Sequence, residues 1–258
     1  MDYTHYHDRV REINSELIED STFKSNPLYN SILEHVSYEL GQQYIDCIVR
    51  EYPHVTFDEI DGFLLMNDSL GAPKRYSYTI YGKAVECSST SLRYIYHALH
   101  ILSYYRDTGC KRIVEVGCGY GGLFLAFNYF SGILKVEIES YAMVDLPEVR
   151  TLITNYLNKH SSNIHIPYTL HDAGRFGRDV YCEDAFFVSN YCFTELPMEL
   201  RTQYMIQLIG RLDRGFITWQ TGFDYVPIEQ VSFCKPLRKV EEERPQTAGE
   251  YKNWFVYF

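Results

Sequence analysis

The sequence lacks a long apolar run and a basic N-terminus. None of its 258 residues falls in a stretch that approaches the roughly 20 apolar residues of a membrane span. The N-terminus, Met-Asp-Tyr-Thr-His-Tyr-His, has neither the basic start nor the apolar core of a signal peptide. We therefore expect a cytoplasmic protein without membrane insertion.

Positive charge and paired cysteines are also scarce. The 24 Lys and Arg stand against 34 Asp and Glu, for a formal net charge of -10. Sequence-independent binding to nucleic acid needs Lys and Arg that meet phosphates, so this balance disfavours a nucleic-acid partner. The seven cysteines include no Cys-x-x-Cys pair, which favours reduced thiols over a disulfide scaffold or a zinc site. We expect no obligatory metal.

One strong local signal is present, the glycine-rich stretch at 111–122. It predicts a short apolar strand, a tight turn and then an apolar helix. Glycine at 117, 119 and 121 lets the backbone approach a ligand closely, and the following helix presents free N–H groups. We interpret the turn as a nucleotide-cofactor site. The alternative is a plain strand-turn-helix connection.

A second predicted strand supports that interpretation. It covers 141–144 and ends in Asp145, a little under 30 residues after Gly117. An acid at that position can accept hydrogen bonds from both ribose hydroxyls of a cofactor. The alternative is a solvated Asp at the end of a structural strand.

From residue 111 onward strands and helices alternate, which is the signature of a parallel sheet covered on both faces. Before that point the signals are mainly helical, with apolar residues at three- and four-residue steps. We predict an N-terminal helical cap over 1–108 and an α/β domain over 109–258. The domain's expected strands are 112–116, 141–145, 163–169, 184–189 and 214–219, and its expected helices are 121–131, 147–159 and 197–210.

Within the helical part, apolar spacing predicts one helix over 29–40 and another around 44–49. A loop with short strands around 76–81 should follow. Ser88 or Ser89 is expected to cap a helix that runs through Tyr105.

The glycine turn resembles motif I of the class I S-adenosylmethionine-dependent methyltransferases. The matching run is Val114-Glu115-Val116-Gly117-Cys118-Gly119-Tyr120-Gly121. Nicotinamide enzymes usually keep Gly-x-Gly-x-x-Gly after an apolar residue, so Glu115 and Gly121 favour the methyl donor. The run Val144-Asp145-Leu146-Pro147 is similar to the Asp-Leu-Pro segment of many O-methyltransferases. The resemblance implies a Rossmann-like, mostly parallel sheet with an antiparallel edge hairpin, formed here by 229–239 and 251–258.

Three further segments resemble the sugar O-methyltransferases encoded with polysaccharide and surface-glycan genes. They are Asn67-Asp68-Ser69-Leu70-Gly71-Ala72-Pro73, then Ser88-Ser89-Thr90-Ser91-Leu92-Arg93-Tyr94 and, after motif I, the run at 188–196. The resemblance implies O-methylation of a sugar hydroxyl in a glycan or sugar nucleotide. The chain ends on an apolar strand-like run, as in a domain cut from a longer multidomain glycan-synthesis protein.

The resemblance also assigns roles in binding S-adenosyl-L-methionine. Glu115 and Gly117 hold its amino acid end, Asp145 and Leu146 its ribose, and Asp172 with Ala173 its adenine edge. A loop or helix cap is the alternative role of Asp172. Arg93 pairs either with the donor carboxylate or with a surface acid. The full donor-binding set is Arg93, Glu115, Gly117, Gly119, Gly121, Asp145, Leu146, Asp172, Ala173 and Asn190.

Methyl transfer to a sugar hydroxyl needs aligned reactants and a base for the hydroxyl proton. Phenol-type O-methyltransferases place a His-Asp pair after the fourth strand, where this sequence has Phe193 and Thr194. The predicted base is therefore Glu195, with His171 second and Tyr191 as an orienting hydroxyl. A charge at a helix N-terminus is the alternative role of Glu195.

Several alternatives stay open. His97 and His100 are spaced as metal ligands but lack a third. The run at 241–245 indicates a solvated turn, although 244–247 falls where the late loop of the resembled family can close over the acceptor. Competing functions are methylation of a small phenolic or carboxylate metabolite, a nicotinamide-dependent oxidoreductase on the same fold, and a non-catalytic donor-binding protein.

Overall fold

The computed structural model describes residues 4–16, 18, 21–223, 233–249 and 251–258. The chain forms two compact units. One comprises Met1–Leu102, Gly119–Val136 and Glu148–His165, and the second comprises Ser103–Cys118, Glu137–Pro147 and Ile166–Phe258. The domain boundary expected at residue 108 stays a prediction.

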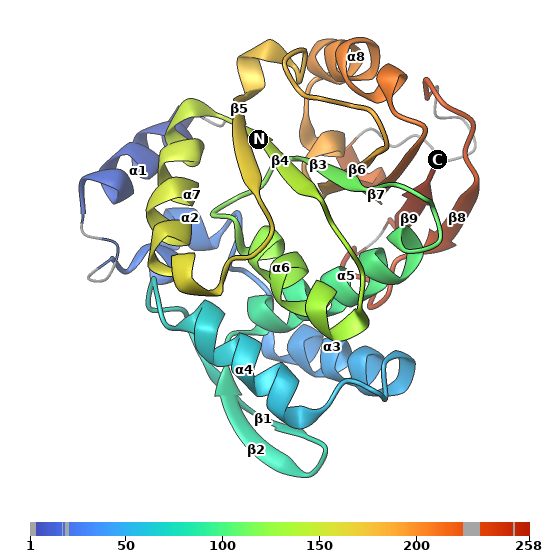
Figure 1. Cartoon of the computed structure of the whole chain (residues 1–258). Helices are drawn as coiled ribbons and strands as arrows, with labels where there is room; N and C mark the ends of the chain where they lie inside the picture. Colours follow the sequence, from blue (N-terminus) through green and yellow to red (C-terminus); the bar gives the residue numbers. More distant parts are fainter. Residues whose placement is uncertain (1–3, 17, 19–20, 224–232, 250) are drawn as a thin grey trace. The chain divides into compact units, whose positions relative to one another are not determined.

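The second unit is built on a seven-stranded sheet with the order β5-β4-β3-β6-β7-β9-β8 (Figure 1). The strands from β5 to β7 are parallel, and β9 pairs antiparallel with both β7 and β8. The predicted α/β sheet, mostly parallel with an antiparallel edge, is confirmed. The strands are β3 Arg112–Val116, β4 Ser140–Asp145, β5 Tyr168–Asp172, β6 Ala185–Asn190, β7 Arg214–Gln220, β8 Lys239–Glu242 and β9 Asn253–Tyr257.

The central strands are buried along nearly their whole length, which is why their apolar residues do not alternate regularly with polar ones. One core of the second unit joins Val116, Phe187 and Ile217 on the strands to Tyr204 and Leu208 at helix α8, Met198–Gln207. This packing fixes the strands and therefore the loops that follow them.

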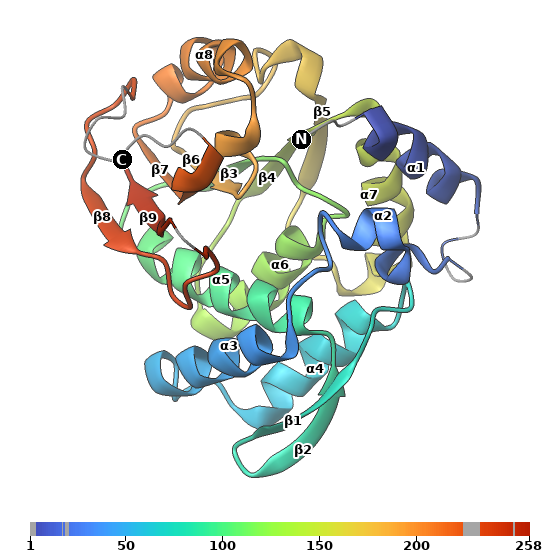
Figure 2. The ribbon, with the colours of Figure 1, turned by 180° about the vertical axis from the view of Figure 1, so that it is seen from behind.

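The first unit is mainly helical and carries a small antiparallel ribbon of β1 (Tyr76–Ile80) and β2 (Lys83–Cys87), which lies beside two helices, α3 and α4 (Figure 2). Both Tyr81 and Gly82 have positive φ, as a tight hairpin turn requires. The helices up to residue 159 are α1 Thr4–Ser15, α2 Pro27–Asn30, α3 Tyr38–Glu51, α4 Phe57–Asp68, α5 Ser89–Tyr105, α6 Gly122–Leu134 and α7 Pro147–Lys159.

The helix predicted over 29–40 is wrong. Helix α2 ends at Asn30, whose side chain donates to the Glu34 carbonyl at 2.9 Å. The Ser37 hydroxyl then accepts from the Leu40 N–H at 3.2 Å and starts the separate helix α3. Side-chain capping therefore overrides the apolar spacing.

The strand predicted at 163–169 is also misplaced. Residues Ser161–Asn163 form a 3₁₀ turn, and β5 begins only at Tyr168. Pro167 has no N–H to give to a neighbouring strand, so it precedes the strand instead of lying within it. Of the predicted edge hairpin, 229–232 lie outside the described residues, and the first strand starts at Lys239.

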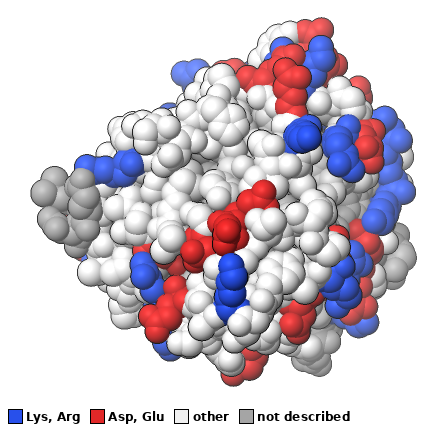
Figure 3. All heavy atoms as spheres, turned by 60° about the horizontal axis from the view of Figure 1, so that its bottom comes forward, with Lys and Arg blue, Asp and Glu red and all other residues white. Residues whose placement is uncertain are grey.

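Surface charges are mixed on the face shown in Figure 3, where acidic and basic side chains are interleaved among uncharged ones. Exposed pairs such as Lys252–Glu242 at 2.6 Å contribute little to stability. Within the described ranges no helix is long and apolar enough to cross a bilayer.

Candidate active site

The strand order reverses at β3, and the candidate site lies at the carboxyl ends of the strands there. The chain builds β3, β4 and β5 in one direction and then returns to add β6 on the other side of β3. In open α/β sheets ligands bind at the carboxyl ends of the strands beside such a reversal. The residues at those ends in the second unit are Gly117, Asp145, Asp172, Asn190 and Gln220.

Gly117 is required by its own surroundings. Its φ is +81°, and a Cβ added there would overlap with Cβ and Sγ of Cys192, from the loop after β6. Its N–H donates to the Val144 carbonyl at 3.2 Å. The absence of a side chain therefore lets the loops after β3 and β6 meet.

Gly119 and Gly121, in the first unit, also have positive φ, +55° and +91°. A Cβ on Gly119 would lie 3.3 Å from the Leu33 side chain. Gly121 immediately precedes α6, and its carbonyl accepts from the Leu125 N–H at 3.0 Å. The positive φ at Gly117, Gly119 and Gly121 is by itself a reason for glycine at each position. Their contact with a donor stays a prediction.

Asp145 holds the start of the glycine turn. Its Oδ2 accepts from the Cys118 backbone N–H at 2.6 Å, and its Oδ1 accepts from the Leu146 N–H at 2.8 Å. The side chain is buried, so these charge-assisted bonds are strong. Each carboxylate oxygen can accept more than one hydrogen bond, so the predicted ribose contact is compatible with this arrangement.

Glu115 is buried in the middle of the sheet and accepts a hydrogen bond from the Tyr141 hydroxyl at 2.9 Å. Burial raises its pKa to about 8, and the nearby charge of Asp145 acts in the same direction. The Glu115 side chain therefore contacts a neighbouring strand of the sheet. Its contact with the amino acid end of the donor stays a prediction.

The site is electronegative around the Cys192 thiol. Burial raises the pKa of Cys192 well above its ordinary value, and the charges of Asp145, Glu195 and Glu115 raise it further. Asp145 ends β4, Glu195 lies in the 3₁₀ turn after β6, and Glu115 lies within β3, where its raised pKa keeps it largely protonated near neutral pH. Such a site favours a cationic ligand over an anionic one.

Asp172 acts as a cap in the structure, which is the alternative role considered for it. Its Oδ1 accepts from the Gly174 N–H at 2.8 Å and begins the 3₁₀ turn Ala173–Arg175. The carbonyl of Ala173 accepts from the Tyr204 hydroxyl at 3.4 Å. Both residues lie at the carboxyl end of β5, so adenine binding by this loop remains a prediction.

His171 lies on the edge strand β5, with both ring nitrogens near polar partners. Its Nδ1 is 3.2 Å from Asp179 Oδ2, and its Nε2 is 2.9 Å from the Thr169 hydroxyl. The pKa of Asp179 is lowered. Burial would raise it, but the hydrogen bond with His171 and the charge of Arg175 outweigh burial. To accept a proton from a substrate, His171 would have to leave one of these partners.

The loop after β6 carries the other predicted residues. The Asn190 Oδ1 accepts from the Thr218 hydroxyl at 2.8 Å. Glu195 is half-buried at the end of the 3₁₀ turn Phe193–Glu195, and Tyr191 has a φ of +62°. Phe193 and Thr194, which replace a His-Asp pair, are both buried. The structure therefore gathers Asp145, Asn190, Tyr191 and Glu195 at one edge of the sheet.

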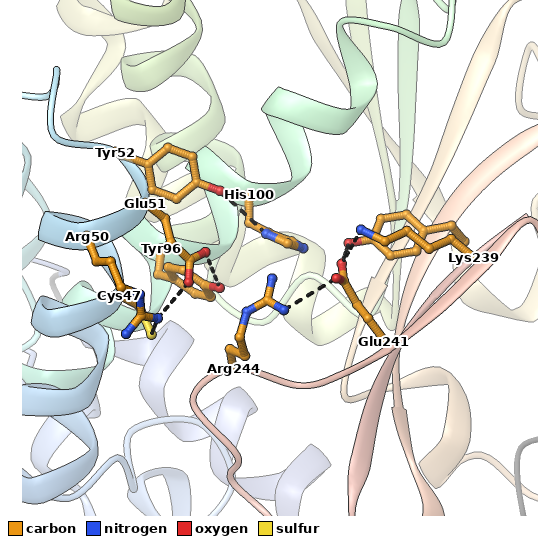
Figure 4. A network of polar contacts seen from close by, with 10 residues as sticks. Cys47, Arg50, Glu51, Tyr52, Tyr96, His100, Lys239, Glu241 and Arg244 are labelled. Carbon is orange, nitrogen blue, oxygen red and sulfur yellow. Dashed lines mark hydrogen bonds and ion pairs between the residues drawn. The ribbon is translucent and has the colours of Figure 1, made fainter.

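Sequence reasoning missed Glu243. The run at 241–245 is not a solvated turn, because the Glu243 side chain is only 1% exposed. It accepts from the Tyr191 hydroxyl and from the Thr247 hydroxyl at 2.7 Å. Glu241 lies in β8 and accepts from the Tyr257 hydroxyl at 2.6 Å and from Lys239 at 2.8 Å (Figure 4). Of the three consecutive glutamates only Glu243 is buried, and the sequence run gave no sign of it.

Two motif segments of the first unit meet around a buried lysine. Asn67 donates to the Ser91 hydroxyl at 2.7 Å and to the Tyr120 hydroxyl at 3.2 Å. Asp68 accepts from the Ser88 N–H at 2.7 Å. The Lys24 ammonium donates to the Asn67 carbonyl and lies 4.5 Å from the centre of the Tyr120 ring. The segments at 67–73 and 88–94 therefore form one buried polar cluster.

Arg93 has a backbone partner, since it donates to the Leu33 carbonyl at 2.8 Å. Pairing with a donor carboxylate stays a prediction. His100 Nδ1 is 3.4 Å from the Tyr52 hydroxyl, and its ring stacks on Tyr96 (Figure 4). Over the described ranges, no three His, Cys, Asp or Glu side chains are grouped so that they could hold a metal ion.

Comparison with known proteins finds likeness in structure and not in sequence. No protein-family profile matches the chain, and no curated protein matches it. The rRNA methylase of Streptococcus thermophilus aligns with 63% of this chain and 93% of its own, at 12% identity and a TM-score of 0.42. TrmN of Thermus thermophilus aligns with 71% and 58%, at 14% identity and a TM-score of 0.42.

A third similar structure is that of CalS10 of Micromonospora echinaspora, an amino pentose methyltransferase with bound SAM. It aligns with 58% of this chain and 57% of its own, at 13% identity and a TM-score of 0.38. This chain therefore spans less than two thirds of CalS10 and of TrmN. The fold assignment rests on the strand order, and none of these likenesses carries a reaction over to this chain.

Proposed function

We propose that this protein is an S-adenosylmethionine-dependent O-methyltransferase that acts on a sugar hydroxyl of a glycan or sugar nucleotide. The observation that carries the proposal is the bond between Asp145 and the Cys118 N–H, which joins the end of β4 to the glycine turn after β3. The bond lies beside the reversal of strand order, where nucleotide ligands bind.

The charges of this edge fit the donor. S-adenosylmethionine has a sulfonium and an ammonium group against one carboxylate, so it is a cation. Burial is the main cause of the raised pKa of the Cys192 thiol, and the nearby carboxylates of Asp145 and Glu195 raise it further, so these two acids place negative charge beside Cys192. The motif resemblance at Glu115 and Gly121 adds to this support. A nicotinamide dinucleotide, with its two phosphates, suits such a site less well.

The bound donor supplies a methyl group already activated by its sulfonium, so the protein's main task is to align the two reactants. Asp145 and Leu146 would hold the ribose and Gly117 the amino acid end. Asp145 also fixes the glycine turn before the donor arrives. A preformed site of this kind lowers the cost of ordering the reactants.

Two observations support a sugar acceptor over a phenol. The segments at 67–73 and 88–94 resemble sugar O-methyltransferases and form one buried cluster in the first unit. At the position of the phenol-type His-Asp pair, Phe193 is 1% exposed and packs in the core with Trp219. A buried phenylalanine cannot take a proton, so a copied phenol mechanism is disfavoured.

The test is a methyl-transfer assay with labelled donor and three acceptor panels: methyl glycosides with UDP-sugars, catechols, and small carboxylic acids. Transfer to a glycoside or UDP-sugar, lost in Asp145→Ala, is the expected result. Transfer only to a catechol or a carboxylate would replace the sugar acceptor with the alternative. Reduction of NAD by any of these compounds would overturn the methyltransferase proposal itself.

A further inference from the structure

The loops after β6 and β8 are joined by one side-chain bond. Strand β9 is antiparallel to both β7 and β8, so β8 runs in the same direction as β6 and β7. Glu243 directly follows β8 and therefore lies at the same edge as Tyr191, which directly follows β6. The Tyr191 hydroxyl donates to Glu243 Oε1 across the ends of the two strands between them, β7 and β9.

We infer that Tyr191 and Glu243 together accept the proton of the substrate hydroxyl, with the Tyr191 phenol in contact with the acceptor and Glu243 as the final proton acceptor. This inference rests on the proposed function.

The two oxygens of the Glu243 carboxylate have different partners, Thr247 at Oε2 and Tyr191 at Oε1. Its Oε2 accepts from the Thr247 N–H at 3.0 Å and from the Thr247 hydroxyl at 2.7 Å. That hydroxyl in turn accepts from Asn253 Nδ2 at 3.0 Å. These neutral donors fix the side chain without providing a counter-charge. Oε1 is the atom that Tyr191 contacts.

Burial makes Glu243 a better proton acceptor than an exposed glutamate. Burial raises its pKa, although the hydrogen bonds from Tyr191 and Thr247 oppose the shift. Of the hydrogen-bond partners of Glu243, Tyr191 is titratable, whereas Thr247 and Asn253 carry no charge. A base with a raised pKa is better matched to reaction near neutral pH.

The backbone of Tyr191 supports a functional role. A φ of +62° is unfavourable for a residue with a side chain and costs on the order of 1 kcal/mol or more. Glycine or asparagine would relieve that cost but could not reach Glu243 with a hydroxyl. Tyr191 is half-buried, at the carboxyl end of β6.

The proton and electron movements balance. The substrate hydroxyl gives its proton to Tyr191 Oη while Tyr191 gives its own proton to Glu243 Oε1. The substrate oxygen forms a bond to the methyl carbon, and the electron pair of the broken carbon–sulfur bond passes to the sulfur, which loses its positive charge. After the product leaves, Glu243 returns the proton through the Tyr191 hydroxyl to water, and both side chains return to their starting state.

The experiment compares Tyr191→Phe and Glu243→Gln with a matched control from the same hairpin. Tyr257 donates to Glu241 Oε1 at 2.6 Å, and it pairs with Phe216 near the start of β7, away from the carboxyl edge. Tyr257→Phe therefore removes the same kind of bond elsewhere. Binding of S-adenosylhomocysteine is measured by calorimetry, and turnover with the methyl glycoside or UDP-sugar that the wild type methylates.

We expect Tyr191→Phe and Glu243→Gln each to lower kcat about 100-fold or more, with binding of S-adenosylhomocysteine changed less than about twofold. The control should leave both unchanged, and Glu243→Asp should restore part of the rate. A second readout needs no turnover. Infrared difference spectra across a pH titration should show a carboxyl band that Glu243→Gln removes and Tyr191→Phe shifts.

The outcomes separate this inference from the proposed function. If the wild type does not bind S-adenosylhomocysteine, the proposed function fails, whatever the infrared spectra show. If it binds and methylates but Glu243→Gln keeps a wild-type rate, the proton-accepting pair is refuted. A carboxyl band that Tyr191→Phe leaves unmoved would also refute it, because the two groups would then not share a proton. Loss of rate in Glu195→Gln alone would assign the base to Glu195 instead.

Discussion

The Asp145 carboxylate lies 2.6 Å from the backbone nitrogen of Cys118, the residue between the first two glycines of the turn. The acid that was predicted to bind a ribose is thus also the residue that fixes the turn. A single side chain therefore connects the end of β4 to the glycine turn after β3. Changes at Asp145 should therefore affect stability and donor binding together.

We predict that Asp145→Ala weakens S-adenosylhomocysteine binding at least tenfold and lowers the free energy of unfolding by about 2 kcal/mol or more. The substitution leaves two buried backbone N–H groups, of Cys118 and Leu146, without their acceptor. Asp145→Asn is the control, because it keeps one acceptor while it removes the charge. Calorimetry and urea unfolding measure the two effects, and an unfolding free energy equal to that of the wild type in the alanine variant would contradict the structure.

A second prediction concerns Gly117. Gly117→Ala should destabilise the protein by about 2 kcal/mol or more, because the new methyl group overlaps with Cys192 and φ is +81°. Adding Cys192→Gly should recover the part that is due to overlap. Gly132, inside α6 with nothing near its Cβ position, is the matched control. Gly132→Ala should be neutral or stabilise by up to about 1 kcal/mol. Equal effects at both glycines in urea unfolding would show that the overlap is not there.

The third prediction is a pH dependence set by Glu115. Its pKa is raised in the folded state to about 8, from an ordinary value of 4.5, so protonated Glu115 favours folding. This contribution is fully present below pH 4.5 and is lost as pH rises toward 8. Glu115→Gln removes the titrating group but can still accept from Tyr141.

The Gln variant should therefore be more stable than the wild type near pH 8, by an amount on the order of a few kcal/mol, and the difference should shrink toward acid pH. Urea unfolding of both proteins at a series of pH values measures it. A difference that does not change with pH would mean that Glu115 titrates normally in the fold.

A fourth prediction tests the buried cluster of the first unit. Lys24 is 0% exposed, and the charges of Glu34 and Asp68 oppose the lowering of its pKa by burial. Lys24→Met keeps the apolar stem but leaves the two acids without this cation, so it should destabilise the protein by about 3 kcal/mol or more. Glu34→Gln in the same chain should recover about 1 kcal/mol or more. Additive effects in urea unfolding would show that Lys24 and Glu34 are not coupled.

The sheet could be predicted from sequence because its signals are local. Ile113, Val114 and Val116 make a mostly apolar strand before the glycines, and Pro147 begins α7 where a helix is expected. The misplaced strand near 163–169 shows the limit of such signals. Apolar residues at 164 and 166 mark burial, and Ile166 is buried, but the strand itself forms after Pro167.

The site could be predicted only in part. Asp145 stands at a strand end, a position that sequence spacing can indicate. Glu243 could not be found in this way, because its burial depends on the pairing of β8 with β9 and on Tyr191, 52 residues earlier. Asp172 was predicted to bind the adenine of the donor, but in the structure its side chain accepts from the Gly174 N–H and caps a local turn. Sequence position alone does not separate these two roles.

The most direct test of the account is calorimetric titration of the wild type and Asp145→Ala with S-adenosylhomocysteine, and of the wild type with NAD. The account predicts saturable binding of S-adenosylhomocysteine to the wild type, at least tenfold weaker binding to the variant, and no binding of NAD. Binding of NAD alone, or of neither compound, would contradict the proposal that this edge of the sheet is a methyl-donor site.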